Sequence, residues 1–186
     1  MAIKTFTTGE VLTASDTNTY LANAGLVYVT SVTPGTNVTS VQINNCFTST
    51  YDNYFVTITN VDCNTNGDVW YAQLSTSGTP SAANYQGNTF YVTSGNTGGL
   101  TNASIGSYFE VCSASNTSTA SGGFNLFQPA LAQWTRCMFG PTVDDFYFRF
   151  GGGVHKVTTS YDGMKIGTVT GSFTGGTITV YGYRKA

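Results

Sequence analysis

One stretch of the chain has the spacing of a calcium-binding loop: Asp62-Cys63-Asn64-Thr65-Asn66-Gly67. Oxygen-bearing side chains at alternate positions and a glycine at the sixth match the opening of such a loop. The twelfth position should carry a bidentate glutamate, but the chain has Gln73 there. The stretch also lies between two segments with strand periodicity, whereas a calcium loop of this type joins two helices. We therefore interpret it as a polar hairpin tip and expect no metal.

The single histidine, His155, follows Asp144 and Asp145 in the chain and precedes Ser160. These residue types can form a catalytic triad, but there is no G-x-S-x-G elbow, and chain order alone does not identify a triad. Two adjacent carboxylates in one strand point to opposite faces, which does not suit a glycosidase pair. We therefore expect His155 on a loop or strand edge, and we predict that the chain is not an enzyme.

Neither the glycine run nor the cysteines have the context of a cofactor site. Gly151, Gly152 and Gly153 are not followed by the G-K-[ST] of a phosphate-binding loop, so we predict a loose hairpin loop there. The cysteines are far apart and form no C-x-x-C pair: Cys46, Cys63, Cys112 and Cys137. This spacing predicts buried or half-buried reduced thiols instead of a zinc site or a disulfide framework. We expect no cofactor.

Aromatic side chains are the remaining candidates for binding. The chain has 12 Tyr, 12 Phe and 2 Trp, and a Tyr or Trp on a sheet face or a loop tip can stack on a sugar ring. The candidate ligand-contact aromatics are Trp70, Tyr85, Tyr91, Trp134 and Tyr161. Each of them has packing in the core as its alternative.

One short helix is predicted near the start of the chain. Thr13 and Asp16 have the spacing of a capping box, and Gly25 supplies a C-terminal cap, so a helix is predicted over 14–24. A helix of this length is marginal alone in water. We therefore expect residues 1–25 to form an arm that must dock against another surface.

The rest of the chain, 26–186, is predicted to consist of strands. Stretches rich in β-branched and aromatic residues alternate with clusters of Gly, Asn, Ser and Thr. The predicted strands are 26–31, 38–43, 54–61, 69–74, 89–93, 107–112, 123–127, 134–139, 145–150, 154–158, 164–170 and 177–183. Stretches 94–104 and 113–123 have few apolar residues and are predicted to be exposed loops.

Alternation within two of these strands predicts which side chains face the core. Tyr54, Val56 and Ile58 share one face of 54–61. In 145–150 the three phenylalanines are predicted to point inward and the residues between them outward. The inward set is Phe146, Phe148 and Phe150, and the outward set is Asp145, Tyr147 and Arg149.

The composition favours an all-β protein with little charge. Only 9% of residues are charged, the formal net charge is −2 and the pI is about 5.0, while nearly half of the chain is Thr, Ser, Asn or Gly. We predict a jelly-roll-like antiparallel β-sandwich over 26–186. The chain has no basic stripe for nucleic acid, no apolar run of the roughly 18 residues that membrane insertion needs, and no apolar signal segment. Synthesis in a cytoplasm is expected.

Three segments resemble structural proteins of tailed-bacteriophage virions, of the tail-fibre, minor-tail and decoration type. Residues 4–21 follow the pattern F-x-x-G-E-V-L-T-A-x-D-x-N-x-Y, residues 173–184 resemble the closing strand with G-G-T-I-x-V-Y-G-Y-R, and residues 47–54 resemble a middle segment. Together they cover about a fifth of the chain. The resemblance implies a virion protein made in the host bacterial cytoplasm, with other phage virion proteins as partners.

The arm, the predicted sandwich and the resemblance together lead to one functional expectation. We expect a homotrimeric tail-fibre or tail-tip adhesin whose head contacts a host-surface glycan. The residues expected to dock the arm in the virion are its large apolar and aromatic side chains: Phe6, Val11, Leu12, Tyr20 and Leu21. A capsid decoration (cement) protein that bridges capsid subunits is the alternative, and a small polysaccharide depolymerase is the third.

Overall fold

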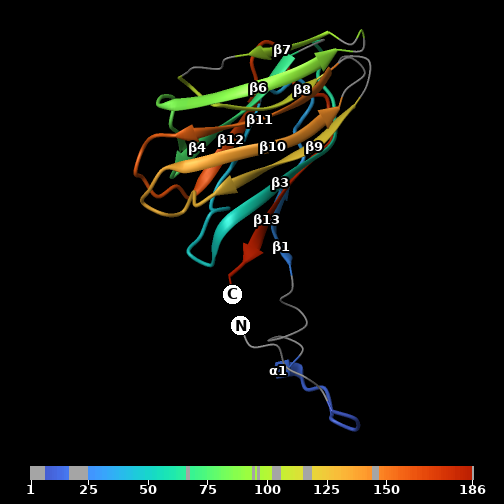
Figure 1. The fold of residues 1–186 in the computed structure, drawn as a ribbon, viewed down its shortest axis with the longest axis vertical. Helices are drawn as coiled ribbons and strands as arrows, with labels where there is room; N and C mark the ends of the chain where they lie inside the picture. Colours follow the sequence, from blue (N-terminus) through green and yellow to red (C-terminus); the bar gives the residue numbers. More distant parts are fainter. Residues whose placement is uncertain are drawn as a thin grey trace.

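The computed structural model describes residues 7–16, 25–65, 68–93, 95, 97–101, 106–114, 119–143 and 147–185. In this part of the chain nearly all regular structure is strand, and the strands form two antiparallel sheets that pack against each other (Figure 1). The antiparallel β-sandwich predicted from composition and strand spacing is confirmed.

Strands distant in sequence lie side by side in the larger sheet. In spatial order its eight strands are β1 (Leu26–Val32), β13 (Thr177–Arg184), β3 (Tyr51–Val61), β9 (Ala120–Phe127), β10 (Thr135–Val143), β11 (Tyr147–His155), β6 (Tyr85–Thr93) and β7 (Gly98–Thr101). The smaller sheet has the order β2 (Ser40–Ile43), β12 (Gly163–Thr168), β4 (Asp68–Thr76) and β5 (Thr79–Pro80). Its fifth strand, β8 (Phe109–Ala114), also pairs with β4.

The core lies between the two sheets. Tyr54, Val56 and Ile58 of β3 are buried, which confirms the face predicted from their alternation. Trp70 of β4 faces them from the smaller sheet and packs edge-on against Phe173, with ring centroids 5.1 Å apart. Burying one large apolar side chain contributes about 1.5–3 kcal/mol. The four cysteines are buried thiols, as predicted.

The predicted hairpin loop at the glycine run is wrong, because Gly151, Gly152 and Gly153 lie inside the continuous strand β11. They pair with β10 on one side and with β6 on the other. A Cβ at Gly151 would lie 2.3 Å from the carbonyl oxygen of Asn88. These glycines therefore allow close approach of neighbouring chain segments.

The predicted orientation of the next residues is also wrong. Phe148 and Phe150 of β11 are 40% and 43% exposed, whereas Arg149 is buried. The alternation itself was correct, but the face was reversed, because Arg149 has an acidic partner on the other sheet. Asp145, Phe146 and the side chain of Tyr147 lie outside the described part of the chain.

Two segments predicted to be loops contain strand residues. The short strand β7 lies within the predicted loop 94–104 and forms one edge of the larger sheet. In the predicted loop 113–123, β8 continues to Ala114 and β9 begins at Ala120. Threonine and glycine there take part in the ladder although they leave little hydrophobic signal.

The predicted capping box is present at the start of α1 (Ala14–Asp16). The Thr13 amide donates to Asp16 Oδ2 at 3.2 Å, and the Asp16 amide donates to Thr13 Oγ1 at 3.1 Å. The rest of the predicted helix, 17–24, lies outside the described residues. Figure 1 shows residues 7–16 away from the two sheets.

Candidate functional site

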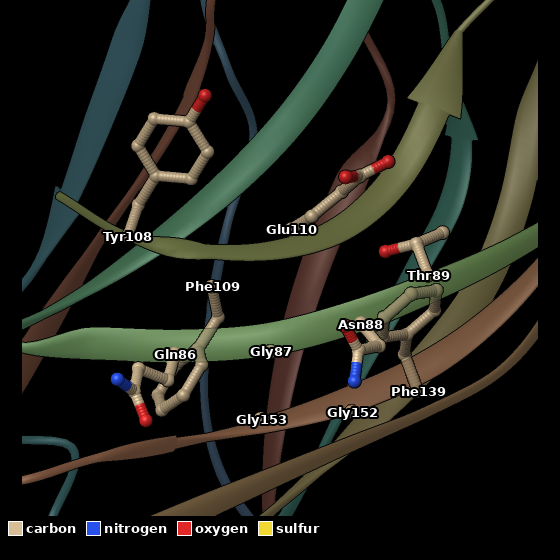
Figure 2. Close-up of a pocket in the computed structure, with 10 residues that line it drawn as sticks. All are labelled: Gln86, Gly87, Asn88, Thr89, Tyr108, Phe109, Glu110, Phe139, Gly152 and Gly153. Atoms are coloured by element: carbon tan, nitrogen blue, oxygen red, sulfur yellow. The ribbon is translucent and has the colours of Figure 1, made fainter. Parts of the chain in front are cut away.

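A small hollow lies at one edge of the sandwich, where β8 of the smaller sheet approaches β6 and β11 of the larger one (Figure 2). We call it the edge hollow. The volume open to the centre of a water molecule is about 10 Å³, which is close to the space that one bound water requires. A larger ligand would therefore contact its rim, without entering.

Polar side chains lie near the edge hollow, but they point to different sides. Figure 2 shows Tyr108, which directly precedes β8, and Glu110 of β8 projecting one way, whereas the Gln86 and Asn88 side chains of β6 project the other way, toward the outward side of the larger sheet. Thr89 is buried. The Tyr108 phenol is a hydrogen-bonding group of the kind that orients a polar ligand.

Glycines bring the walls of the edge hollow close together. A Cβ at Gly153 would lie 2.5 Å from the carbonyl oxygen of Gln86 and 3.2 Å from the Phe109 ring. A Cβ at Gly87 would lie 2.7 Å from the carbonyl oxygen of Gly152. The two contacts with carbonyl oxygens are closer than real Cβ atoms tolerate without a shift of the backbone, so any side chain here would push the strands apart.

An ion pair joins the two sheets beside the edge hollow. Arg149 Nη1 of β11 lies 2.5 Å from Glu110 Oε1 of β8, and each side chain is 9% exposed. The Arg149 guanidinium also lies over the ring of Tyr91, 5.9 Å from its centroid. No sequence pattern predicts this pair, because the two residues are far apart in the chain. The face of Arg149 was also predicted wrongly.

Tyr108 stacks on a second aromatic ring outside the edge hollow. Its ring centroid is 4.9 Å from that of Tyr71, with an angle of 29° between the planes. The ammonium of Lys165 lies 5.5 Å from the Tyr71 centroid. Burial raises the pKa of the Tyr108 hydroxyl, with nearby Glu110 acting in the same direction, so this hydroxyl remains protonated at neutral pH.

The structure does not bring the five predicted ligand-contact aromatics together. Trp70, Tyr85 and Tyr161 are buried, so the core alternative holds for these three. Tyr91 is half-buried against Arg149. Trp134 is 44% exposed, and the ammonium of Lys156 lies 5.9 Å from its ring centroid.

His155 is a core residue at the end of β11. Its ring is stacked on Tyr85 with centroids 4.1 Å apart, and its Nε2 lies 2.6 Å from Tyr161 Oη and 3.3 Å from Ser81 Oγ. Burial lowers its pKa. The predicted neighbours Asp144 and Asp145 lie outside the described residues.

Asp68 is a buried carboxylate whose contacts are those of a structural group. Its Oδ1 accepts from the amides of Val69 and Thr170, and its Oδ2 accepts from the Gly171 amide at 2.7 Å. The carboxylate thereby fixes the segment that follows β12. In the described part of the chain no group of three His, Cys, Asp or Glu side chains is arranged to hold a metal.

The predicted docking residues are only partly within the described chain. Val11 is 78% exposed and Leu12 is 49% exposed. Phe6, Tyr20 and Leu21 lie outside the described residues. Among the described docking residues, Val11 is therefore largely open to solvent and Leu12 about half so.

Comparisons with protein-family models, curated proteins and solved structures found no match for this chain. Among the described residues, no helix has the length and apolar character to span a membrane.

Proposed function

We propose that this chain is a bacteriophage virion structural protein, a tail-fibre or tail-tip adhesin that attaches by its N-terminal segment. The observation that carries the proposal is the exposure of Val11 and Leu12 on a segment separate from the sandwich (Figure 1). The resemblance of residues 4–21 to phage tail proteins supports the same role. Other virion proteins supply the apolar surface that these side chains lack, and the chain assembles as a homotrimer.

The head presents the rim of the edge hollow to a host-surface glycan in this proposal. The Tyr108 hydroxyl offers a hydrogen bond to a sugar hydroxyl, and Trp134 offers a separate exposed ring. Because these groups are uncharged, contact with a neutral polysaccharide depends little on salt. The Arg149–Glu110 pair holds β8 in position behind the rim.

Particle incorporation tests the attachment. Full burial of a leucine contributes about 1.5–3 kcal/mol, so Leu12→Asp should weaken docking by about 10- to 100-fold. Leu12→Met is the matched control and should leave incorporation unchanged. A chain shortened to begin at Leu26 should keep its β-sheet spectrum and lose incorporation. Full incorporation of the shortened chain would refute attachment through this segment.

Copy number and location in an electron-microscopy map of the particle distinguish the adhesin from a decoration protein. A tail position with a few to tens of copies supports the adhesin, whereas hundreds of copies on the capsid would replace it with the cement role.

For the glycan contact, Tyr108→Ala and Trp134→Ala should reduce binding of host-surface polysaccharide, and Val169→Ala on the smaller sheet serves as control. Unchanged binding in both aromatic variants would refute this site.

A further inference from the structure

The outward side of the larger sheet carries a continuous uncharged row of side chains. Pairing registers place one residue of each of seven neighbouring strands in this row. We call the outward side chains of this sheet the outer face. From β1 to β6 the row reads Tyr28, Tyr181, Phe55, Asn125, Met138, Gly152 and Asn88.

Beside this row, β11, β6 and β7 bear a cluster of exposed apolar side chains. Phe150, Phe90 and Leu100 are direct cross-strand partners, and the Phe90 and Phe150 ring centroids are 5.1 Å apart. Leu100 is 69% exposed, Phe150 43% and Met138 57%. Large apolar side chains that meet one another on an exposed sheet face indicate an interaction surface.

The outer face carries almost no charge. On β9, β10, β11 and β6, the one charged side chain among the outward positions that the structure describes is Arg136. The opposite side of the sandwich differs, since it carries Lys165 and hydrogen-bonded Gln73 beside Tyr71. Because it belongs to the eight-stranded sheet, the outer face is also broader than the opposite side of the described sandwich.

We propose that the outer face is the surface through which copies of this chain associate, with the outer face of each of three copies turned toward a common three-fold axis. An uncharged face can meet itself without bringing like charges together, which a self-association surface must avoid. The inference rests on the homotrimer of the proposed function and names its contact surface. Three such faces would enclose a three-fold axis like the sides of a prism.

The dimensions of the outer face suit such a contact. The eight strands lie about 4.8 Å apart, and each contributes about six residues with a rise of about 3.3 Å per residue. The sheet therefore covers roughly 700 Å², without the additional surface of the projecting side chains. A specific interface uses about 800 Å² per partner. The surface of the outer face is uneven, because Met138 and Phe150 project beside Gly140 and Gly152, which have no side chains. Projections next to gaps allow two such faces to interdigitate.

The mass of the full chain in solution tests this inference. Light scattering over a range of concentrations should give an oligomer for the unaltered protein. Phe150→Asp and, separately, Leu100→Asp should raise the dissociation constant by about 30-fold or more, the effect of losing a buried apolar anchor. Val169→Asp is the control, since Val169 is 48% exposed but follows β12 of the smaller sheet, and it should not change the mass. Circular dichroism confirms that each variant remains folded.

Oxidation of Met138 by peroxide provides a second measurement, in which the side chain that reports on the interface is itself unaltered. Met138 should oxidise more slowly in the oligomer than in the Phe150→Asp variant, whereas buried Met164 should be protected in both. A monomeric unaltered chain, or equal oxidation of Met138 in both proteins, would overturn the inference. Protection of Met138 by polysaccharide in a monomer would also overturn it and assign the face to a ligand. Failure of this inference would appear in the solution mass and in Met138 oxidation, whereas failure of attachment through Leu12 would appear in incorporation into particles. The two failures are therefore distinguishable.

Discussion

Removing one partner of the Arg149–Glu110 pair should destabilise the sandwich far more than removing a surface charge. The pair joins β11 to β8 across the two sheets, and each side chain is 9% exposed. Glu110→Gln removes the charge that faces Arg149 Nη1, and Arg149→Met removes the charge that faces Glu110 Oε1. Breaking a buried ion pair in this way costs about 3–5 kcal/mol.

The double variant distinguishes pairing from simple loss of side chains. In Glu110→Gln with Arg149→Met neither charge remains, so the cost should be well below the sum of the two single costs. For a chain of this length, about 1 kcal/mol corresponds to about 2–4 °C in Tm. Each single variant should therefore melt about 6–20 °C lower, and the double variant should recover part of that loss.

Urea unfolding followed by circular dichroism measures these free energies of unfolding. The exposed pair between Lys185 and Asp52 is the control, with an Nζ to Oδ1 distance of 2.7 Å and side chains about 40% exposed. Lys185→Met should cost less than about 1 kcal/mol. If Arg149→Met costs no more than Lys185→Met, or if the double variant costs the full sum, the reasoning about this pair is wrong.

Four further outcomes are expected. Asp68→Ala should cost about 3 kcal/mol in unfolding free energy, because several amides lose a charged acceptor, and Asp68→Asn should cost less because it keeps one oxygen; equal losses in urea titrations would contradict this. Burial lowers the pKa of His155, so stability should be constant above about pH 6.5, the unfolded value, and fall as the pH drops below it. In His155→Gln that fall should be smaller, and an unchanged pH profile would refute the assignment. Burial raises the pKa of Cys46 to about 12, and all four thiols are buried, so a thiol-reactive dye should label the native protein slowly and the urea-unfolded protein fully; rapid native labelling would show exposed thiols. A chelator should leave Tm unchanged, because Gln73 replaces the acidic calcium ligand, and a drop of several degrees would reveal a structural metal.

Local patterns allowed the correct predictions from sequence. The Thr13–Asp16 capping box depends on residues three apart, and both of its hydrogen bonds are present. The alternation of Tyr54, Val56 and Ile58 placed one face of β3 in the core. Both predictions needed only the geometry of a few neighbouring residues.

Predictions that depended on distant partners failed. Alternation in β11 gave the period but not the face, because nothing near Arg149 in the chain indicates Glu110 on the other sheet. A glycine run favours a turn when read locally, but the glycines of β11 allow close approach to β6. Likewise, the Tyr85 hydroxyl accepts a hydrogen bond from the Leu74 amide across the sandwich, at 2.8 Å. The Tyr85 ring, predicted as a possible ligand contact, is therefore part of the core.

The position of β13 has a consequence for biosynthesis. β13 lies between β1 and β3, so the first strand of the larger sheet has no neighbour until Thr177–Arg184 has been made. Pairings between such distant segments form slowly. A chain interrupted before Thr177 would expose the open edges of β1 and β3, which are templates for aggregation. The sheet order therefore makes completion of translation a condition for a soluble product, and interrupted chains should be lost to aggregation or proteolysis before they reach an assembly.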